Sequence, residues 1–253
     1  IYFLGEEAYG LVTFFSTLQT TMNLLGLGLS KTIRREFASG DDSNDSKLNK
    51  YKLMRSVELV YMGIALLIIF ICSISAEYIA GQWLNIGLLS LKIVTSTIRL
   101  MGISIGLQII TNLYSGCLFG LEFQVKANVL QIIWSLCKNS GCILLIWLIA
   151  PDVRLFYSWH IVVDILYLVI LRYSTIKILR CDIPLRWCMK DLVNLKSIWK
   201  FAFGLMLISF VYVLNTQLDK AIISKYLTLT DLGAYNTAFS LGNLTSIVAS
   251  AVA

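Results

Sequence analysis

The sequence predicts an all-α integral membrane protein, and three observations indicate this class. Hydrophobic residues make up 57% of the 253 positions, whereas charged residues make up only 14%, against about 25% in ordinary soluble domains. The mean hydropathy is +0.76. The apolar residues also gather in runs of about 20, the length that crosses the hydrocarbon core of a bilayer as a helix. This composition excludes a soluble domain, and it excludes a disordered chain, which would be poor in apolar residues.

Six apolar runs are long enough to cross a membrane, and a seventh continues to the end of the chain. Continuous runs of this length favour helices, because membrane-barrel strands alternate in polarity over about ten residues. Pro151 falls between the fourth and fifth runs and Pro184 follows the fifth, where helices should stop. The expected spans are residues 8–30, 57–75, 93–119, 128–150, 155–175, 198–222 and 232–253.

The distribution of Lys and Arg predicts the orientation of these spans. Most basic residues lie in the loop 31–55, at Lys126 and in the segment 177–200, all on one side of the predicted membrane. The positive-inside rule places that side in the cytoplasm, so that the chain begins outside. A chain that begins outside and opens with Ile1 is expected to be a fragment of a longer protein that has an earlier helix.

The segment 185–199 has the pattern of a helix that lies on the inner leaflet. Apolar side chains recur at helical spacing, and basic or polar side chains occupy the other face. A simple linker between two helical bundles is the alternative. We therefore expect three parts: a membrane bundle over 1–179, a cytoplasmic linker over 180–197, and the first helices of a second bundle over 198–253.

Polar side chains form rows along several predicted spans, which favours a shared polar cavity over simple contacts between helices. The rows and the ionisable residues near them give the candidate cavity residues Asn23, Arg99, Lys138, Asp164 and Asp219. Since an unpaired charge in the bilayer costs at least about 2.5–3.5 kcal/mol, we expect Lys138 to pair with Asp164 across this cavity, with Arg99 adding positive charge. A pair that only holds two helices together is the alternative.

His160 lies one helical turn from Asp164, so the two side chains could relay protons. A position near the outer interface, beside Trp159, would instead make His160 an anchor in the headgroup region. We expect no metal site and no cofactor, because the chain has one His and no cysteines at zinc-ligand spacing. The sequence also lacks a phosphate-binding glycine-rich loop and a serine nucleophile elbow.

Several short motifs resemble those of Wzx-type polysaccharide flippases, which are transporters related to the multidrug-extrusion (MATE-like) group. They are Leu-Gly-Glu-Glu-Ala-Tyr-Gly at 4–10, Leu-Gly-Leu-Gly-Leu-Ser at 25–30, Arg-Arg-Glu at 34–36, Gly-Leu-Glu-Phe-Gln-Val-Lys-Ala-Asn at 120–128, Leu-Asp-Lys-Ala-Ile-Ile-Ser-Lys at 218–225 and Leu-Gly-Ala-Tyr at 232–235. Glu122 departs from the basic residue that many relatives have.

The pattern Leu-Gly…Ala-Tyr occurs at the start of the chain and again at 232–235. Such an internal repeat is typical of transporters that are built from two repeated halves.

This resemblance implies a two-bundle flippase in the bacterial inner membrane, of which the chain covers about the second to the eighth helix. The implied substrate is an oligosaccharide repeat unit linked to undecaprenyl diphosphate and destined for O-antigen or capsule. Arg99 and Lys138 would offset the diphosphate charge, with Arg34 and Arg35 at the cytoplasmic mouth. The implied partners are membrane lipids, a polysaccharide polymerase and glycosyltransferases, and nucleic acid is not among them.

Two other functions remain open at this point. A multidrug or cation antiporter of the same superfamily would bind small cations rather than lipid-linked sugars. A membrane-embedded glycan polymerase or acyltransferase should need an extended outer loop or an essential intramembrane histidine, for which only His160 is available.

Overall fold

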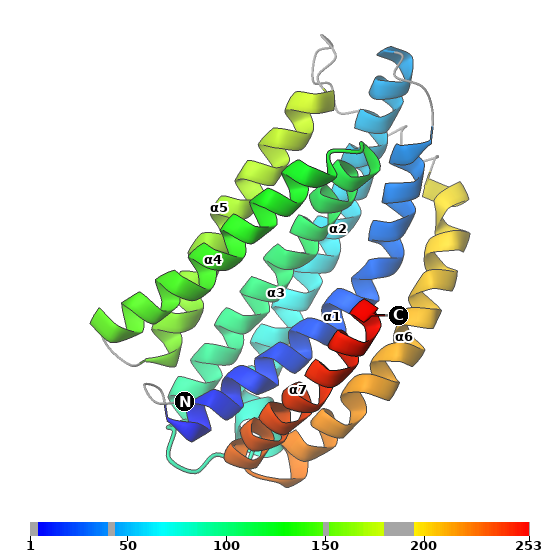
Figure 1. Ribbon diagram of the computed structural model, residues 1–253. Coiled ribbons are helices and arrows are strands. Elements are labelled where there is room, and N and C mark those ends of the chain that lie inside the picture. The colour runs from blue at the N-terminus through cyan, green and yellow to red at the C-terminus, as the bar shows by residue number, and fades with distance from the viewer. Residues whose placement is uncertain (1–4, 40–43, 149–151, 180–194, 253) are drawn as a thin grey trace.

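The computed structural model describes residues 5–39, 44–148, 152–179 and 195–252, which form long helices lying roughly side by side (Figure 1). The described residues of each of the seven predicted runs lie in one helix, so the predicted all-α class is confirmed. The helices are α1 (Glu6–Ala38), α2 (Asn44–Tyr78) continued by the π-helical turn η1 (Ile79–Trp83), α3 (Leu91–Gly120), α4 (Gln124–Leu148), α5 (Val153–Leu179), α6 (Leu195–Tyr226) and α7 (Leu229–Val252).

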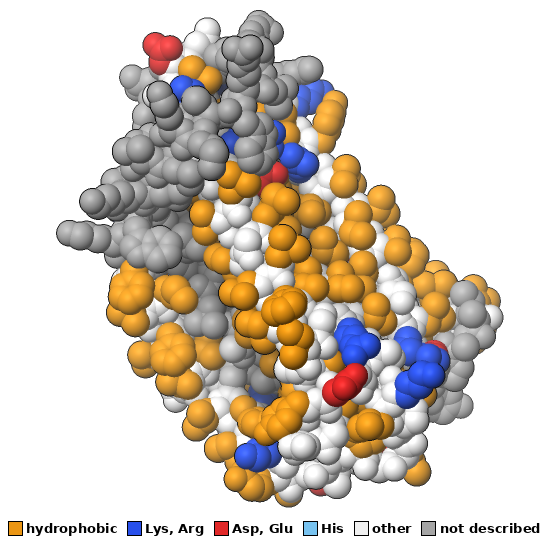
Figure 2. Space-filling model, turned by 180° about the vertical axis from the view of Figure 1, so that it is seen from behind, with side chains coloured by type: hydrophobic (Ala, Val, Ile, Leu, Met, Phe, Trp, Pro, Cys, Tyr) orange, Lys and Arg blue, Asp and Glu red, His pale blue; other side chains and the backbone are white. Residues whose placement is uncertain are grey.

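Four helical segments are long and apolar enough to cross a membrane by length and composition. They are Asn44–Trp83, Leu91–Gly120, Gln124–Leu148 and Phe203–Tyr226. Large apolar side chains of α2, α4 and α6 are exposed along much of their length, and hydrophobic side chains cover much of the face seen in Figure 2. Exposed apolar surface of this extent is stable in contact with lipid rather than water, so the protein is a multi-pass membrane protein.

Helix α3 lies at the centre of one group of helices. It contacts α1, α2, α4 and α5, and α5 also packs against α4. Helix α1 contacts α3 on one side and α6 and α7 on the other, so it separates the α2–α5 group from the last two helices (Figure 1). This arrangement makes α1 the helix whose polar side chains can reach both groups.

Two glycines allow α3 to approach α1 closely. A Cβ at Gly116 would lie 3.2 Å from the backbone oxygen of Ser30, and a Cβ at Gly120 would lie 2.7 Å from the backbone oxygen of Arg34. Any larger residue would push the two backbones apart. The Ser30 hydroxyl uses this proximity to donate a hydrogen bond of 3.2 Å to the backbone oxygen of Asn112.

The predicted inner-leaflet helix at 185–199 lies mostly outside the described residues. Helix α6 begins at Leu195, three residues before the predicted start of the second bundle. The second Leu-Gly…Ala-Tyr motif also differs in its setting. Gly5 precedes α1 with a φ of 83°, a left-handed conformation that favours glycine, whereas Gly233 lies inside α7.

Candidate functional site

The structure brings Lys138 of α4 and Asp164 of α5 together in a buried ion pair. The ammonium nitrogen of Lys138 lies 2.9 and 3.0 Å from the two carboxylate oxygens of Asp164. The two side chains are only 7% and 1% exposed. The residues are adjacent because α4 and α5 are sequential, antiparallel helices, which gives both side chains a similar depth.

Asp164 also accepts hydrogen bonds from two neutral donors. The Ser104 hydroxyl of α3 donates to one carboxylate oxygen at 2.7 Å, and the Trp134 indole of α4 donates to the other at 2.9 Å. The Lys138 ammonium lies 4.8 Å from the centre of the Trp134 ring, a cation–π distance. Trp134 in turn stacks on Tyr167 of α5, with ring centres 5.0 Å apart. One carboxylate therefore connects three helices.

This environment differs in part from the sequence prediction. The expected pair is present, but it lies inside the α3–α4–α5 group and does not line the large cavity described below. Arg99, which was expected to add charge to the pair, instead forms an ion pair of 2.9 Å with Glu77 of α2. Half of the Arg99 side chain is exposed, because this position faces α2 and the surface rather than α4 and α5.

His160 is buried, but it makes no hydrogen bond to Asp164. Neither ring nitrogen has a hydrogen-bond partner among the described residues. Its ring packs against Phe156 and Tyr157, with centres 4.2 and 5.8 Å away. The predicted proton relay between His160 and Asp164 thus has no direct contact in this conformation, and His160 lies in an aromatic cluster of α5.

Asn23 belongs to a cluster of amide side chains between α1 and α3. Its Nδ2 donates to Oε1 of Gln108 at 3.5 Å, and its Oδ1 accepts from Asn112 at 3.1 Å. Gln19, one turn away on α1, also donates to Oε1 of Gln108. The Gln108 amide nitrogen is buried and has no partner among the described residues. We call Gln19, Asn23, Gln108 and Asn112 the amide cluster.

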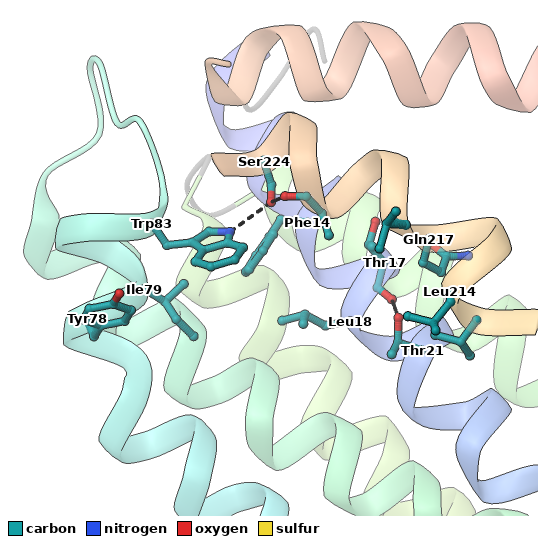
Figure 3. A pocket seen from close by; sticks show the side chains of 13 residues that line it. Phe14, Thr17, Leu18, Thr21, Tyr78, Ile79, Trp83, Leu214, Gln217 and Ser224 are labelled. Atoms are coloured by element: carbon teal, nitrogen blue, oxygen red, sulfur yellow. Dashed lines mark hydrogen bonds between the residues drawn. The ribbon is translucent and has the colours of Figure 1, made fainter. Parts of the chain in front are cut away.

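A cavity of about 480 Å³ lies between α1, α6 and the end of α2 with η1 (Figure 3). We call this end of the bundle the outer end, after the orientation that the basic residues predict. The lining of the cavity is mostly apolar, and the Trp83 indole donates a hydrogen bond of 3.1 Å to the Ser224 hydroxyl at one end. Thr17 and Thr21 of α1 and Gln217 of α6 lie toward the other end (Figure 3). The side-chain oxygen of Gln217 is buried without a hydrogen-bond partner among the described residues.

The outer ends of the helices are joined by a carboxylate. Glu7, in the first turn of α1, accepts three backbone hydrogen bonds of 2.6, 2.6 and 3.0 Å from Gly87, Leu88 and Leu89. Hydrogen bonds from backbone N–H groups to a charged acceptor are among the stronger ones. They hold the loop between η1 and α3 against the start of α1.

The same loop also contacts the turn between α6 and α7. Asn85 donates to the backbone oxygens of Lys225 and Leu227 at 3.2 and 3.1 Å, and it forms a parallel β-bridge with Thr228. The Lys225 ammonium lies 5.0 Å from the centre of the Trp83 ring. We call these contacts, together with those of Glu7, the outer junction.

Glycines bring α1 and α7 together beside this junction. A Cβ at Gly10 would lie 1.8 Å from the backbone oxygen of Leu229, so only glycine fits there. Gly233 packs against Tyr9 and Gly10 in the same way, and the hydroxyls of Tyr9 and Thr237 are hydrogen-bonded at 3.2 Å. The described part of the first Leu-Gly…Ala-Tyr motif therefore contacts the second motif, through Tyr9 and Gly233.

The remaining predicted residues, Asp219, Arg34 and Arg35, lie on α6 and α1, two of the helices that line the cavity. Asp219 of α6 accepts a hydrogen bond from the Tyr235 hydroxyl of α7. At the opposite end of α1, the Arg34 guanidinium lies 4.3 Å from the centre of the Phe119 ring, and Arg35 pairs with Glu36 at 3.2 Å.

Among the described residues, no group of three His, Cys, Asp or Glu side chains is suited to hold a metal ion.

Sequence reasoning missed several of these residues. Gln108 and Asn112 have partners on another helix, whereas the contacts of Glu7 and Asn85 join the ends of helices to the loop between η1 and α3. These contacts depend on how far each helix rotates about its axis and on the course of the loop, which the sequence pattern does not determine. One signal was available: Gln108 and Asn112 are four residues apart in an apolar run, and this spacing places two amides on one helix face.

A family model described as polysaccharide biosynthesis protein matches residues 2–253. No curated protein and no solved structure matches the chain significantly.

The ion-pair geometry predicts how substitutions at Lys138 and Asp164 change stability. Asp164→Leu should destabilise the protein by about 3–5 kcal/mol, because it leaves a buried ammonium without its carboxylate. The double substitution Lys138→Met/Asp164→Leu should recover most of this loss, since it removes both charges and fills a similar volume. Thermal unfolding of the purified protein in detergent measures the difference. A double variant as unstable as the sum of the single variants would contradict the assigned pairing.

Proposed function

This chain belongs to the polysaccharide biosynthesis protein family, and we propose that it is a flippase of the Wzx type in the bacterial inner membrane. Its substrate would be an oligosaccharide repeat unit linked to undecaprenyl diphosphate, moved from the inner to the outer leaflet. The observation that carries this proposal is the family match over residues 2–253 together with the membrane-spanning helices.

The arrangement of α1 and α6 supports a path between the two helix groups. Such a substrate combines sugars, which need hydrogen bonds, with a diphosphate and an isoprenoid chain, which need cations and apolar surface. The cavity between α1 and α6 offers apolar surface with polar groups at its ends. Substrate sites between repeated halves are typical of transporters with two bundles.

Polar residues near this path provide the groups that such a substrate needs. The amide cluster, on the α3 side of α1, has a buried donor without a partner among the described residues, the Gln108 amide nitrogen. A movement of α1 against α3 would make it available to a sugar hydroxyl. Asn23 holds Gln108 and Asn112 in place, while Asp219 offers carboxylate oxygens on α6. Arg34 and Arg35, at the inner end of α1, are our candidates for the diphosphate at the cytoplasmic mouth.

We assign a different role to the Lys138–Asp164 pair. Because it connects α3, α4 and α5 and is almost fully buried, it is suited to keep these helices together as one rigid unit. Alternating access would then separate this unit from α6 and α7 at the outer junction. The contacts of that junction are confined to the outer side, so their loss would open a path there and preserve the buried network.

The amide cluster predicts the effect of a substitution at Asn23. Asn23→Leu keeps the volume but removes the hydrogen bonds to Gln108 and Asn112. Surface polysaccharide should fall to about a tenth of the wild-type amount or less, since the loss of about 1.4 kcal/mol of transition-state binding lowers a rate tenfold. The amount of protein in the membrane should be unchanged.

The matched control for this experiment is Asn139→Leu on α4. Asn139 is exposed and bonds only within its own helix, to Ser135, among the contacts described. Surface polysaccharide in cells with Asn139→Leu should equal that of the wild type. Normal export by Asn23→Leu would contradict a role of the amide cluster in transport.

The outer junction predicts that a covalent link across it blocks transport. Asn85 and Thr228 face each other in a β-bridge, so cysteines there would be within disulfide reach. In a background in which the six native cysteines are replaced, the pair Asn85→Cys/Thr228→Cys should form a disulfide under oxidation. Surface polysaccharide export should then drop about tenfold or more and recover when a reductant is added.

The single variants Asn85→Cys and Thr228→Cys provide the control, because each loses its own side-chain contacts without forming a link. Both should export normally with and without reductant. Normal export by the fully cross-linked protein would show that the junction does not open, and it would overturn alternating access by this route.

A further inference from the structure

A second buried carboxylate lies in the half of the bundle that we place toward the cytoplasm. Glu58 of α2 is 6% exposed. Its oxygens lie 2.8 Å from the Arg55 guanidinium, 2.8 Å from the Tyr114 hydroxyl of α3 and 3.2 Å from the Arg172 guanidinium of α5. This cluster was not predicted, and neither the ion-pair site nor the outer junction involves it.

The contacts of Arg172 differ from those of the other two partners. Arg55 approaches one oxygen of Glu58 at hydrogen-bond distance, whereas Arg172 shares the second oxygen with the Tyr114 hydroxyl at a longer distance. A guanidinium has five N–H groups in a planar fork, and the contact with Glu58 occupies one of its nitrogens. Arg172 is therefore held in place by Glu58, and its other donors have no hydrogen-bond partner among the described residues.

Arg172 is also the partner that reaches the surface. Its side chain is 46% exposed, against 22% for Arg55 and 8% for Glu58. Exposed apolar side chains are near this position along both helices: Leu59 and Met62 follow Glu58 on α2, and Val169 and Tyr173 flank Arg172 on α5. Arg55 and Arg172 share the single carboxylate of Glu58, so the cluster keeps a net positive charge. A half-exposed cation with this excess charge, within an apolar, lipid-facing surface, favours an anionic partner from the membrane.

Arg172 lies near the end of the predicted span 155–175 that we place toward the cytoplasm. The residue lies seven positions before the end of α5 at Leu179, or about 10 Å along the helix. Tyr114 lies six positions before the end of α3 at Gly120, which gives a similar depth. Arg172 lies three positions before the end of the predicted span, about 4.5 Å along the helix, and a long arginine side chain can cover this distance toward the interface. Lys177, five residues further, is also exposed.

We propose that Arg172, held by Glu58 between α2 and α5, binds the phosphate of an anionic phospholipid in the cytoplasmic leaflet. The planar fork of the guanidinium matches two phosphate oxygens, and the acyl chains lie on the exposed apolar residues of α2 and α5. Basic pockets between membrane helices on the cytoplasmic side are known to hold such headgroups. The inference rests on the fold and its orientation and does not require flippase activity.

Native mass spectrometry of the purified protein tests this site directly. The protein is released from nanodiscs that contain equal amounts of phosphatidylglycerol and phosphatidylethanolamine, and the lipids that stay bound are counted. The wild type should retain phosphatidylglycerol in preference to phosphatidylethanolamine. In Arg172→Gln, the ratio of bound phosphatidylglycerol to bound phosphatidylethanolamine should fall about tenfold, the change expected when a contact of about 1.4 kcal/mol is removed.

Arg154→Gln on the same helix is the matched control. Arg154 is 49% exposed and also pairs with a carboxylate, Asp152, at 2.7 Å, but it lies at the outer end of α5. Its hydrogen bonds lower the pKa of Asp152 below the ordinary value, so the pair is an ordinary ion pair at the surface. Arg154→Gln should retain phosphatidylglycerol as the wild type does.

A second measurement separates lipid binding from folding. Added phosphatidylglycerol should raise the melting temperature of the wild type and of Arg154→Gln in detergent, whereas it should not raise that of Arg172→Gln. Equal lipid retention and equal stabilisation in Arg172→Gln and Arg154→Gln would overturn the proposal. Retention of an isoprenyl phosphate in place of phosphatidylglycerol, when both are supplied, would also overturn the assignment to a phospholipid.

Discussion

The buried pairing of Asp164 with Lys138, Ser104 and Trp134 is the interaction on which the α3–α4–α5 group depends. A carboxylate in the hydrocarbon region is stable only when charge and hydrogen bonds compensate its lost hydration. Here the compensation comes from two neighbouring helices, because Ser104 lies on α3 and the other two residues lie on α4. The constraint therefore determines which faces of three helices meet.

Glu58 obeys the same constraint at a different depth. Its partners lie on α2, α3 and α5, so the two carboxylates together connect all four helices from α2 to α5. The contacts of α1 with α6 and α7 are of another kind. An apolar cavity lies between α1 and α6, Tyr9 and Thr237 are hydrogen-bonded between α1 and α7, and the loop between η1 and α3 bonds to the start of α1 and to the turn between α6 and α7. This contrast suits a rigid unit that moves against a second one. Breaking the outer junction leaves no buried charge unpaired, whereas breaking either carboxylate network does.

The sequence was sufficient to predict the helices and the Lys138–Asp164 pair, because apolar run length and antiparallel neighbours determine them. It was not sufficient for Arg99, which the structure pairs with Glu77 on α2. It also did not reveal the roles of Glu7 and Glu58. Each of these pairings depends on the rotation of a helix about its axis and on the course of a loop.

The amide cluster shows which contacts the sequence could not predict. Asn23 stood out because it belongs to a polar row on one helix, whereas Gln108 and Asn112 become significant only once α3 is placed against α1. Gly116 and Gly120 set that approach. Close packing of this kind is a property of two surfaces together, and periodicity along a single helix does not encode it.

Transfer of lipid-linked oligosaccharide between the leaflets of a proteoliposome is the most direct test of the central claim. With the substrate in both leaflets, a glycosidase added outside reaches about half of it in vesicles that lack a flippase. Vesicles that contain this protein should expose nearly all of the substrate, because lipid from the inner leaflet is continually moved outward. Protection of the inner half in the presence of folded protein would contradict the proposed function.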